Sequence, residues 1–119
     1  MNAEIVQSFR FEAAHFLPNV PPQHRCLRMH GHSYKVDVAV SGPIDPVTGW
    51  VVDFFDIEAV FQPLLKVLDH HLLNEIAGLD NPTAEIIAAW IWERLVPGLP
   101  GLSQVTVHET EHCRATVRG

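Results

Sequence analysis

Two segments in the first third of the chain alternate apolar and polar residues, which is the pattern of strands with one buried face. We predict strands over residues 4–12 and 33–41. Their apolar positions include Ile5, Phe9 and Phe11 in the first, and Tyr34, Val36, Val38 and Val40 in the second. The prolines within residues 16–29 predict a long loop between the two strands. After the second strand, residues 42–49 read as a turn and residues 50–54 as extended.

A third segment carries apolar residues at helical spacing and predicts a helix. Asp56 is a favourable N-cap residue, and Phe55 and Val60 are spaced for a hydrophobic staple across it. Pro63 lies inside this pattern and predicts a kink or an early irregular turn. The apolar positions are Ile57, Val60, Phe61, Leu64 and Leu68.

A second helix is predicted to start near Asn81-Pro82-Thr83, which offers a capping residue and a proline in the first turn. Pro97-Gly98 ends it. Its apolar stripe comprises Ile87, Trp90, Ile91 and Leu95. Residues 103–110 and 113–118 then predict two further strands.

Four strands and two helices in a chain of 119 residues predict a single α+β domain spanning residues 1–119. The sheet is expected to be open, and its edges carry unpaired backbone groups that nothing obvious in the sequence blocks. A homo-oligomer that pairs strands between subunits is the natural solution.

The charge balance restricts the partners. Lys and Arg number 8 against 14 Asp and Glu, a formal charge of −6. This balance disfavours nonspecific nucleic-acid binding, which requires a basic footprint. It is compatible with a small anionic ligand held by local cations such as Arg10, Arg25, Arg28 or Lys35.

No apolar run is long enough to span a bilayer, and the N-terminus lacks the charged and apolar regions of a signal peptide. We therefore expect a cytoplasmic protein without a membrane partner. In a reducing compartment Cys26 and Cys113 are expected as thiols, although a bridge between them is an alternative.

The most informative chemical residues are His15, Cys26, His30 and His32. In an extended backbone His30 and His32 point to the same side, so their imidazoles can bind one metal ion, and His15 can add a third nitrogen. Three nitrogens leave a tetrahedral zinc ion one position short, which is typical of a catalytic site. Cys26 is either a fourth ligand that closes the site or a reactive thiol.

A lone His-x-His pair also occurs by chance, with imidazoles that merely line a core. The 8 histidines of this chain, several beside Asp, Glu or Cys, favour chemistry instead.

Two other positions carry carboxylates that suggest a role. Glu109 shares the parity of Val105 and Val107, so it continues an apolar face, where it could accept two parallel N–H donors from a pterin or guanine edge. The alternative for Glu109 is a salt bridge or a solvated strand end. In Asp69-His70 the carboxylate can orient the imidazole for acid–base catalysis, or the pair can be a polar helix end.

Together these residues resemble the 6-pyruvoyl-tetrahydropterin synthase superfamily, and most closely its 6-carboxy-5,6,7,8-tetrahydropterin synthase branch in the queuosine pathway. The similarity runs from about residue 5 to the end, and three residues between Cys26 and His30 are typical of the carboxy branch. The motifs that carry it are Phe11-Glu-Ala-Ala-His15, Cys26-x3-His30-Gly-His32, Asp53-Phe, Leu68-Asp-His-His71, Asn81-Pro-Thr-Ala-Glu85 and His108-Glu-Thr110.

The resemblance implies the tunnelling fold: a four-stranded antiparallel sheet with two helices on one face, trimers that close a β-barrel, and a hexamer of two trimers with active sites between subunits. It also implies roles for individual residues: Zn²⁺ bound by His15, His30 and His32, proton transfer by Cys26, Asp69 and His70, a pterin anchor in Glu109, and a pocket segment containing Thr83 and Glu85.

The implied reaction converts 7,8-dihydroneopterin triphosphate to 6-carboxy-5,6,7,8-tetrahydropterin, acetaldehyde and triphosphate.

Three alternatives to this function stay open. The first is a pyruvoyl-forming synthase that stops before side-chain cleavage. The second is a cupin-like oxygenase, which the two predicted helices disfavour. The third is a non-enzymatic module whose structural zinc is closed by Cys26.

Overall fold

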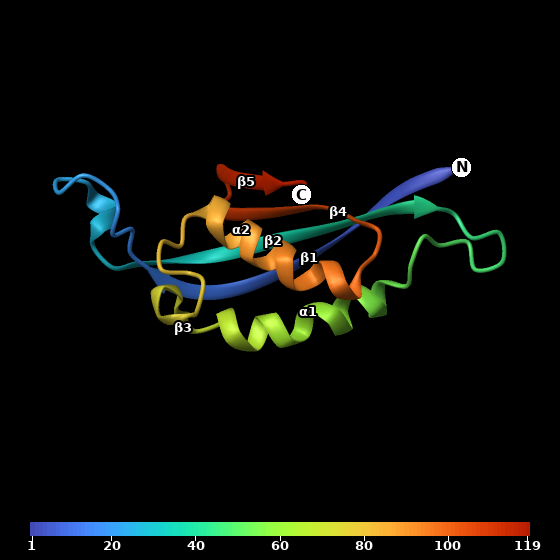
Figure 1. Cartoon of the computed structure of the whole chain (residues 1–119), viewed down its shortest axis with the longest axis horizontal. Coiled ribbons are helices and arrows are strands. Elements are labelled where there is room, and N and C mark those ends of the chain that lie inside the picture. The colour runs from blue at the N-terminus through green and yellow to red at the C-terminus, as the bar shows by residue number, and fades with distance from the viewer.

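The computed structural model describes residues 1–119 as a sheet covered on one face by two helices (Figure 1). The strands occur in the order β3-β1-β2-β4-β5. The elements are β1 (Asn2–His15), β2 (His30–Pro43), α1 (Phe54–Leu68), β3 (His71–Leu72), α2 (Ala84–Leu95), β4 (Leu102–Thr110) and β5 (Cys113–Val117). Neither helix is both long and apolar enough to cross a bilayer.

The strands β1 and β2 form one long antiparallel pair that sets the shape of the molecule. Each strand has 14 residues, and the register runs without a break from Asn2 opposite Pro43 to His15 opposite His30. Both strands are longer than the predicted ranges 4–12 and 33–41. Because they extend to His15 and His30, the three candidate histidines lie on strands rather than in the loop.

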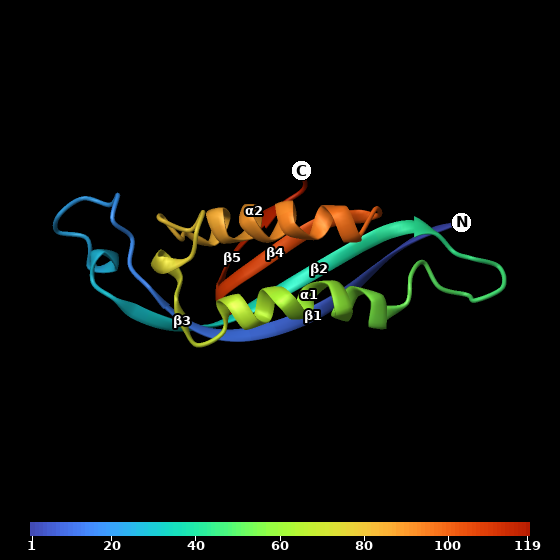
Figure 2. The same ribbon diagram turned by 60° about the horizontal axis from the view of Figure 1, so that its bottom comes forward.

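The core lies between the sheet and the two helices. Alternate residues of β1 and β2 point to the same face of the sheet and are buried there. Both helices pack their apolar residues against this face (Figure 2). One aromatic stack joins the sheet to α1, with Phe9 on Phe61 and ring centroids 4.1 Å apart, and a second joins β1 to β2, with Phe11 on Tyr34 at 4.8 Å. The predicted placement of both helices on one face is therefore confirmed.

The sheet is mixed and five-stranded, which corrects the expectation of four antiparallel strands. The four predicted strands are present and pair antiparallel, but β3 adds a parallel partner to β1 through Ala13 opposite His71. A strand of two residues is too short to show any periodicity. It forms because the chain leaving α1 passes along β1, where His70 N donates to the Glu12 carbonyl.

The helix α1 begins earlier than predicted. The side chain of Asp53, not Asp56, accepts the capping hydrogen bond from Phe55 N, at 2.9 Å. Phe55 therefore lies inside the first turn, where it is 76% exposed, and the predicted hydrophobic staple is absent. Residues 50–52 are bends rather than an extended strand, and residue 54 already belongs to the helix.

One continuous helix passes through Pro63, so an irregular turn is not found, and the predicted kink stays a prediction. Pro63 and Ala59 are both exposed, and the Ala59 carbonyl that loses its N–H partner can be hydrated. The start of α2 also differs slightly from expectation. Thr83 is its N-cap and accepts from Ile86 N, so Pro82 precedes the helix instead of standing in its first turn.

The two aspartates at the start of α1 give a direct test of the cap. Asp53→Ala is expected to lower the free energy of unfolding by about 1 kcal/mol, because it leaves the Phe55 N–H without its partner. Asp56→Ala removes only a favourable charge in the first turn and is expected to cost less than about 0.5 kcal/mol. Urea unfolding of both variants measures the difference, and equal losses would contradict the assigned cap.

Candidate metal centre

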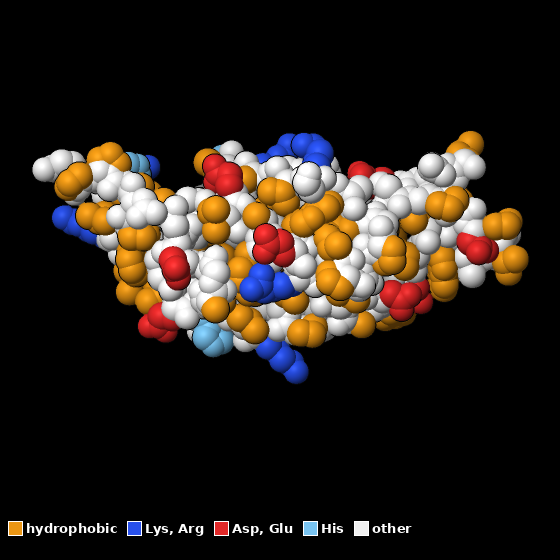
Figure 3. Space-filling model, in the orientation of Figure 1, with side chains coloured by type: hydrophobic (Ala, Val, Ile, Leu, Met, Phe, Trp, Pro, Cys, Tyr) orange, Lys and Arg blue, Asp and Glu red, His pale blue; other side chains and the backbone are white.

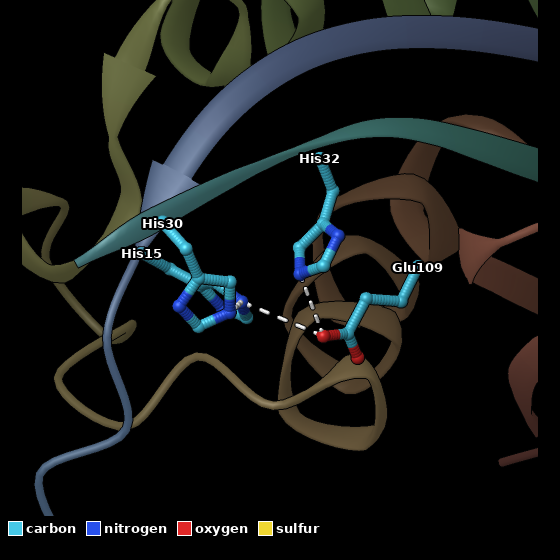
Figure 4. A group of neighbouring side chains, drawn as sticks. All are labelled: His15, His30, His32 and Glu109. Carbon is cyan, nitrogen blue, oxygen red and sulfur yellow. Dashed lines mark hydrogen bonds and ion pairs between the residues drawn. The ribbon is translucent and has the colours of Figure 1, made fainter. Parts of the chain in front are cut away.

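Three histidines meet on the helix-bearing face where β1 and β2 end. His15 pairs across the strands with His30, and His32 lies two residues further along β2. The ring centroids of the three imidazoles are 4.6, 4.9 and 5.1 Å apart. Figure 4 shows the rings directed into one space, with the carboxylate of Glu109 from β4 facing them. The sequence prediction that these imidazoles converge is confirmed.

Backbone carbonyls fix the orientation of two of the rings. Nδ1 of His15 lies 2.8 Å from the Pro82 carbonyl, and Nδ1 of His30 lies 2.7 Å from the Arg28 carbonyl. A carbonyl oxygen only accepts, so Nδ1 carries the proton in both rings. The lone pair then resides on Nε2, the nitrogen that faces the cluster. Such outer hydrogen bonds are typical of histidines that bind metals.

The two Nε2 atoms face each other at 3.0 Å. Two lone pairs at this distance repel, and only a proton or a metal cation between them removes the repulsion. Zn–N bonds of about 2.05 Å in a tetrahedral site place two nitrogens roughly 3.3 Å apart. The observed spacing is therefore close to the spacing that a bound metal ion requires.

Glu109 completes a group of four donors. Its Oε1 lies 2.9 Å from Nε2 of His32 and 3.5 Å from Nε2 of His15. Although the distance to Glu109 is short, the buried Nε2 of His32 makes no well-oriented hydrogen bond, so this nitrogen also has a free ligand position. One ligand atom from each of the four residues lies within 4.8 Å of the others, and together they form a possible metal site.

The electrostatics of the cluster favour a bound cation. Contact with His15 and with the other two imidazoles holds the pKa of Glu109 below its usual range, against the opposing effect of burial. Burial lowers the pKa of His32, although the Glu109 charge opposes it. A deprotonated carboxylate beside neutral imidazoles is a donor set that suits a divalent transition metal.

Cys26 lies beside this group rather than in it. It belongs to a 3₁₀ turn, Arg25–Leu27, that is tied back to the start of the loop because Leu17 N donates to the Cys26 carbonyl, at 2.8 Å. Cys26 lines a cavity of about 440 Å³ together with His30, His32 and Glu109. The fourth possible ligand in the cluster is the carboxylate of Glu109 and not the sulfur of Cys26. This arrangement disfavours the alternative of a structural zinc whose fourth ligand is Cys26.

Asp69 and His70 occupy the turn after α1. Asp69 Oδ1 accepts from Glu12 N at 2.9 Å, and this bond is the main cause that lowers the pKa of Asp69. Asp69 Oδ2 lies 3.0 Å from Nδ1 of His70. His70 has a φ of 59°, an uncommon value for a residue other than glycine. Such a backbone conformation is often found at functional sites.

His70 lines a second cavity, of about 550 Å³, which also contains His32. Cys26 is absent from this cavity, so the chain by itself does not bring the two proposed proton-transfer groups together. They lie in separate cavities that share His32. Their meeting across a subunit interface stays a prediction.

Thr83 and Glu85 do not belong to the group of four possible metal ligands. Thr83 caps α2, Glu85 is exposed in the first turn of that helix, and neither lines the cavities that contain His32. The nearest contribution of this segment is the Pro82 carbonyl that holds His15. Sequence reasoning missed this role, and that of the Arg28 carbonyl, because a backbone acceptor leaves no trace in residue identity.

An open sheet with two helices on one face and a three-histidine centre at one end defines an α+β protein with a candidate transition-metal site. The comparison with known families agrees with this description. The chain belongs to the 6-pyruvoyl tetrahydropterin synthase family, which matches residues 4–119.

Two curated relatives are similar over most of their length. A 6-carboxy-5,6,7,8-tetrahydropterin synthase of Synechocystis sp. is 43% identical over 96% of this chain and 90% of its own. A dihydroneopterin monophosphate aldolase of Pyrococcus furiosus is 40% identical over 85% of this chain and 82% of its own. The solved structure of the Caenorhabditis elegans 6-pyruvoyl tetrahydropterin synthase is 24% identical, covers all of this chain and 96% of its own, and superposes with a TM-score of 0.92.

Proposed function

We propose that this protein is a zinc-dependent lyase that converts 7,8-dihydroneopterin triphosphate to 6-carboxy-5,6,7,8-tetrahydropterin, acetaldehyde and triphosphate, as a step of queuosine biosynthesis. The observation that carries the proposal is the convergence of His15, His30 and His32 beside a cavity lined by Cys26. The similarity to the Synechocystis 6-carboxy-5,6,7,8-tetrahydropterin synthase supports the choice of reaction.

Zinc bound by the three histidines would act as a Lewis acid toward the side-chain oxygens of the substrate. The chain itself supplies the groups that hold and move protons. Cys26 lines the cavity that contains His30 and His32, so its thiol can exchange a proton with a substrate carbon held there. His70, with Asp69 beside its Nδ1, lines the second cavity that contains His32 and can serve another position.

Glu109 is proposed to anchor the pterin ring. An ionised carboxylate that accepts two parallel N–H groups makes a strong and directional contact. Its lowered pKa keeps it ionised at neutral pH. In the free chain Glu109 faces the imidazoles, and contact with a pterin requires it to leave the metal group. With Glu109 on the pterin, the three imidazoles would remain to hold the metal.

The active unit is proposed to be a homohexamer of two trimers, each trimer closing a β-barrel. The sheet is open in the single chain, with β3 and β5 at its edges. Edges of this kind are available for pairing with another copy. Assembly would also bring Asp69 and His70 of one subunit toward Cys26 of another, and it would place Thr83 and Glu85 against the pocket of a neighbour.

Two other reactions are candidates. The relative from Pyrococcus furiosus is a dihydroneopterin monophosphate aldolase, so a monophosphate substrate with aldol cleavage is the first. The second is formation of the 6-pyruvoyl product, which retains the whole side chain. The human 6-pyruvoyl tetrahydrobiopterin synthase is 38% identical over 76% of this chain and 66% of its own.

Incubation of the zinc-loaded protein with dihydroneopterin triphosphate, followed by mass analysis of the pterins, tests the proposal. We expect the 6-carboxy product and one equivalent of acetaldehyde. A parallel reaction with dihydroneopterin monophosphate tests the aldolase alternative, and chelator-treated protein is the control. A pterin that keeps its three-carbon side chain, or turnover of the monophosphate alone, would refute the assignment.

A further inference from the structure

Four basic residues form a row across the sheet on the face that the helices leave uncovered. Arg10 on β1 lies opposite Lys35 on β2, Lys35 lies opposite His108 on β4, and His108 lies opposite Arg114 on β5. Neighbouring strands are about 4.8 Å apart, so the side chains of this basic row stand at one level of the sheet. In a chain with a net charge of −6, this alignment is unexpected.

Arg10, Lys35 and Arg114 of the basic row form no ion pair. The ion pairs of this protein all join a histidine to a carboxylate, and none includes a lysine or an arginine. His108 is held by Asp37, whose Oδ2 lies 2.8 Å from its Nε2. Arg10, Lys35 and Arg114 therefore keep their full donor capacity, although like charges directly opposite each other destabilise a sheet.

The side that carries the helices has no such alignment. In the space-filling view of that side, basic side chains are interspersed with acidic and apolar ones (Figure 3). The basic row is thus a local feature of the uncovered face and does not reflect a generally basic surface.

The basic row borders a cavity that reaches the candidate metal centre. Arg10, Lys35 and Arg114 line a space of about 620 Å³ that also contains His32 and Glu109, and no apolar side chain contributes to it. Strand pairing explains the connection. The last residue pair between β2 and β4 on the side of the metal centre is Lys35 opposite His108. Beyond this pair the two strands are no longer paired, and the cavity lies between them.

We infer that Arg10, Lys35 and Arg114 bind the triphosphate group of the substrate, an inference that rests on the proposed function. Arginine binds phosphate oxygens through two parallel N–H groups, and lysine adds a point charge. Three cations in a row match a chain of three phosphates better than a single phosphate. The cavity shared with His32 and Glu109 leaves the pterin end of the same substrate at the metal centre.

Arg25 and Arg28 are the alternative phosphate ligands, because they line the cavity of Cys26. An oligophosphate in that cavity would fill the space beside the thiol. The basic row carries no such conflict, so it is the better site.

Calorimetric titration of the full-length, zinc-loaded protein with inorganic triphosphate tests the inference without any turnover. Arg10→Gln, Lys35→Gln and Arg114→Gln are each expected to weaken triphosphate binding by about tenfold or more, because each removes hydrogen bonds to a charged group. Lys66→Gln, which removes an exposed charge from α1, is the matched control and should bind as the wild type does. Inorganic phosphate is expected to bind far more weakly than triphosphate.

Steady-state kinetics separate the substrate from free oligophosphate. If the basic row holds the substrate, the three variants raise KM with little change in kcat, while metal content stays the same. Wild-type affinity for triphosphate in all three variants, or loss only in Arg25→Gln, would overturn the inference. Weakened triphosphate binding with an unchanged KM would assign the row to free oligophosphate and reject the substrate assignment. If no pterin product forms while triphosphate binding depends on the row, the proposed reaction fails but the anion site stands.

Discussion

His30→Ala is expected to lower the affinity for the metal by more than about 100-fold and to abolish turnover at ordinary zinc concentrations. Loss of a residue that only hydrogen-bonds to a metal ligand typically lowers metal affinity by about 10- to 100-fold. His30 is itself a candidate ligand, so its loss should cost more. Its Nε2 is one of the two nitrogens that face each other at 3.0 Å. Without it, the repulsion that favours a bound cation disappears.

The variant should fold, because His30 is only partly buried and stands at the first position of β2. Dialysis against a zinc buffer, followed by elemental analysis, measures the metal retained. His112→Ala is the matched control, since its ring is 85% exposed on the turn between β4 and β5. Stoichiometric zinc in His30→Ala, with activity close to the wild type, would show that the three-histidine group is not the metal centre.

A metal-free sample of the wild type extends the same experiment. A ligand that binds only the folded state stabilises it, and the gain grows with the ratio of free ligand to Kd. Zinc is therefore expected to raise the melting temperature of the wild type but not that of His30→Ala. The two results together separate loss of binding from loss of structure.

The sequence was sufficient to locate the histidines because strand periodicity is a local property. The two-residue spacing of His30 and His32 placed both imidazoles on the same side of an extended backbone, and the register of the long strand pair then brings His15 opposite His30. The same periodicity placed Glu109 on the apolar face of its strand. Its contact with the imidazoles depends on how β4 lies beside β2, which the residues of β4 alone do not specify.

The features that sequence reasoning missed depend on tertiary contacts. The two-residue strand β3 exists because the turn after α1 runs along β1. The helix cap moved from Asp56 to Asp53 because both positions carry a good capping residue, and local propensity does not choose between them. The carbonyls of Pro82 and Arg28 hold the metal-binding rings, although neither side chain predicts it.

Cys26 and His70 lie in different cavities of the single chain, and this separation has a consequence for the proposed chemistry. Each group lines a cavity together with His32, and neither lines the cavity of the other. A substrate at the metal would thus meet the thiol and the imidazole from different cavities. Removal of either group is expected to impair proton transfer without disturbing the metal.

Cys26→Ala is expected to retain the metal and to lower kcat by about 10²- to 10⁴-fold, which is the usual contribution of a positioned acid–base group. Retention follows from the geometry, because the four donors of the cluster are three imidazoles and a carboxylate. The 3₁₀ turn should persist, since the hydrogen bonds that hold it use the backbone N–H and carbonyl of Cys26 and not its sulfur.

Cys113→Ala provides the matched control, because Cys113 is an exposed thiol that lines the same cavity as Cys26. It is expected to leave both kcat and metal content unchanged. Zinc analysis and kcat measured side by side then distinguish the possible roles of the thiol. Loss of zinc from Cys26→Ala would make the sulfur a ligand, and an unchanged kcat would make it a bystander. Retained zinc together with slow turnover is the one result that agrees with the proposed role. In that role the thiol of Cys26 transfers protons but does not bind the metal.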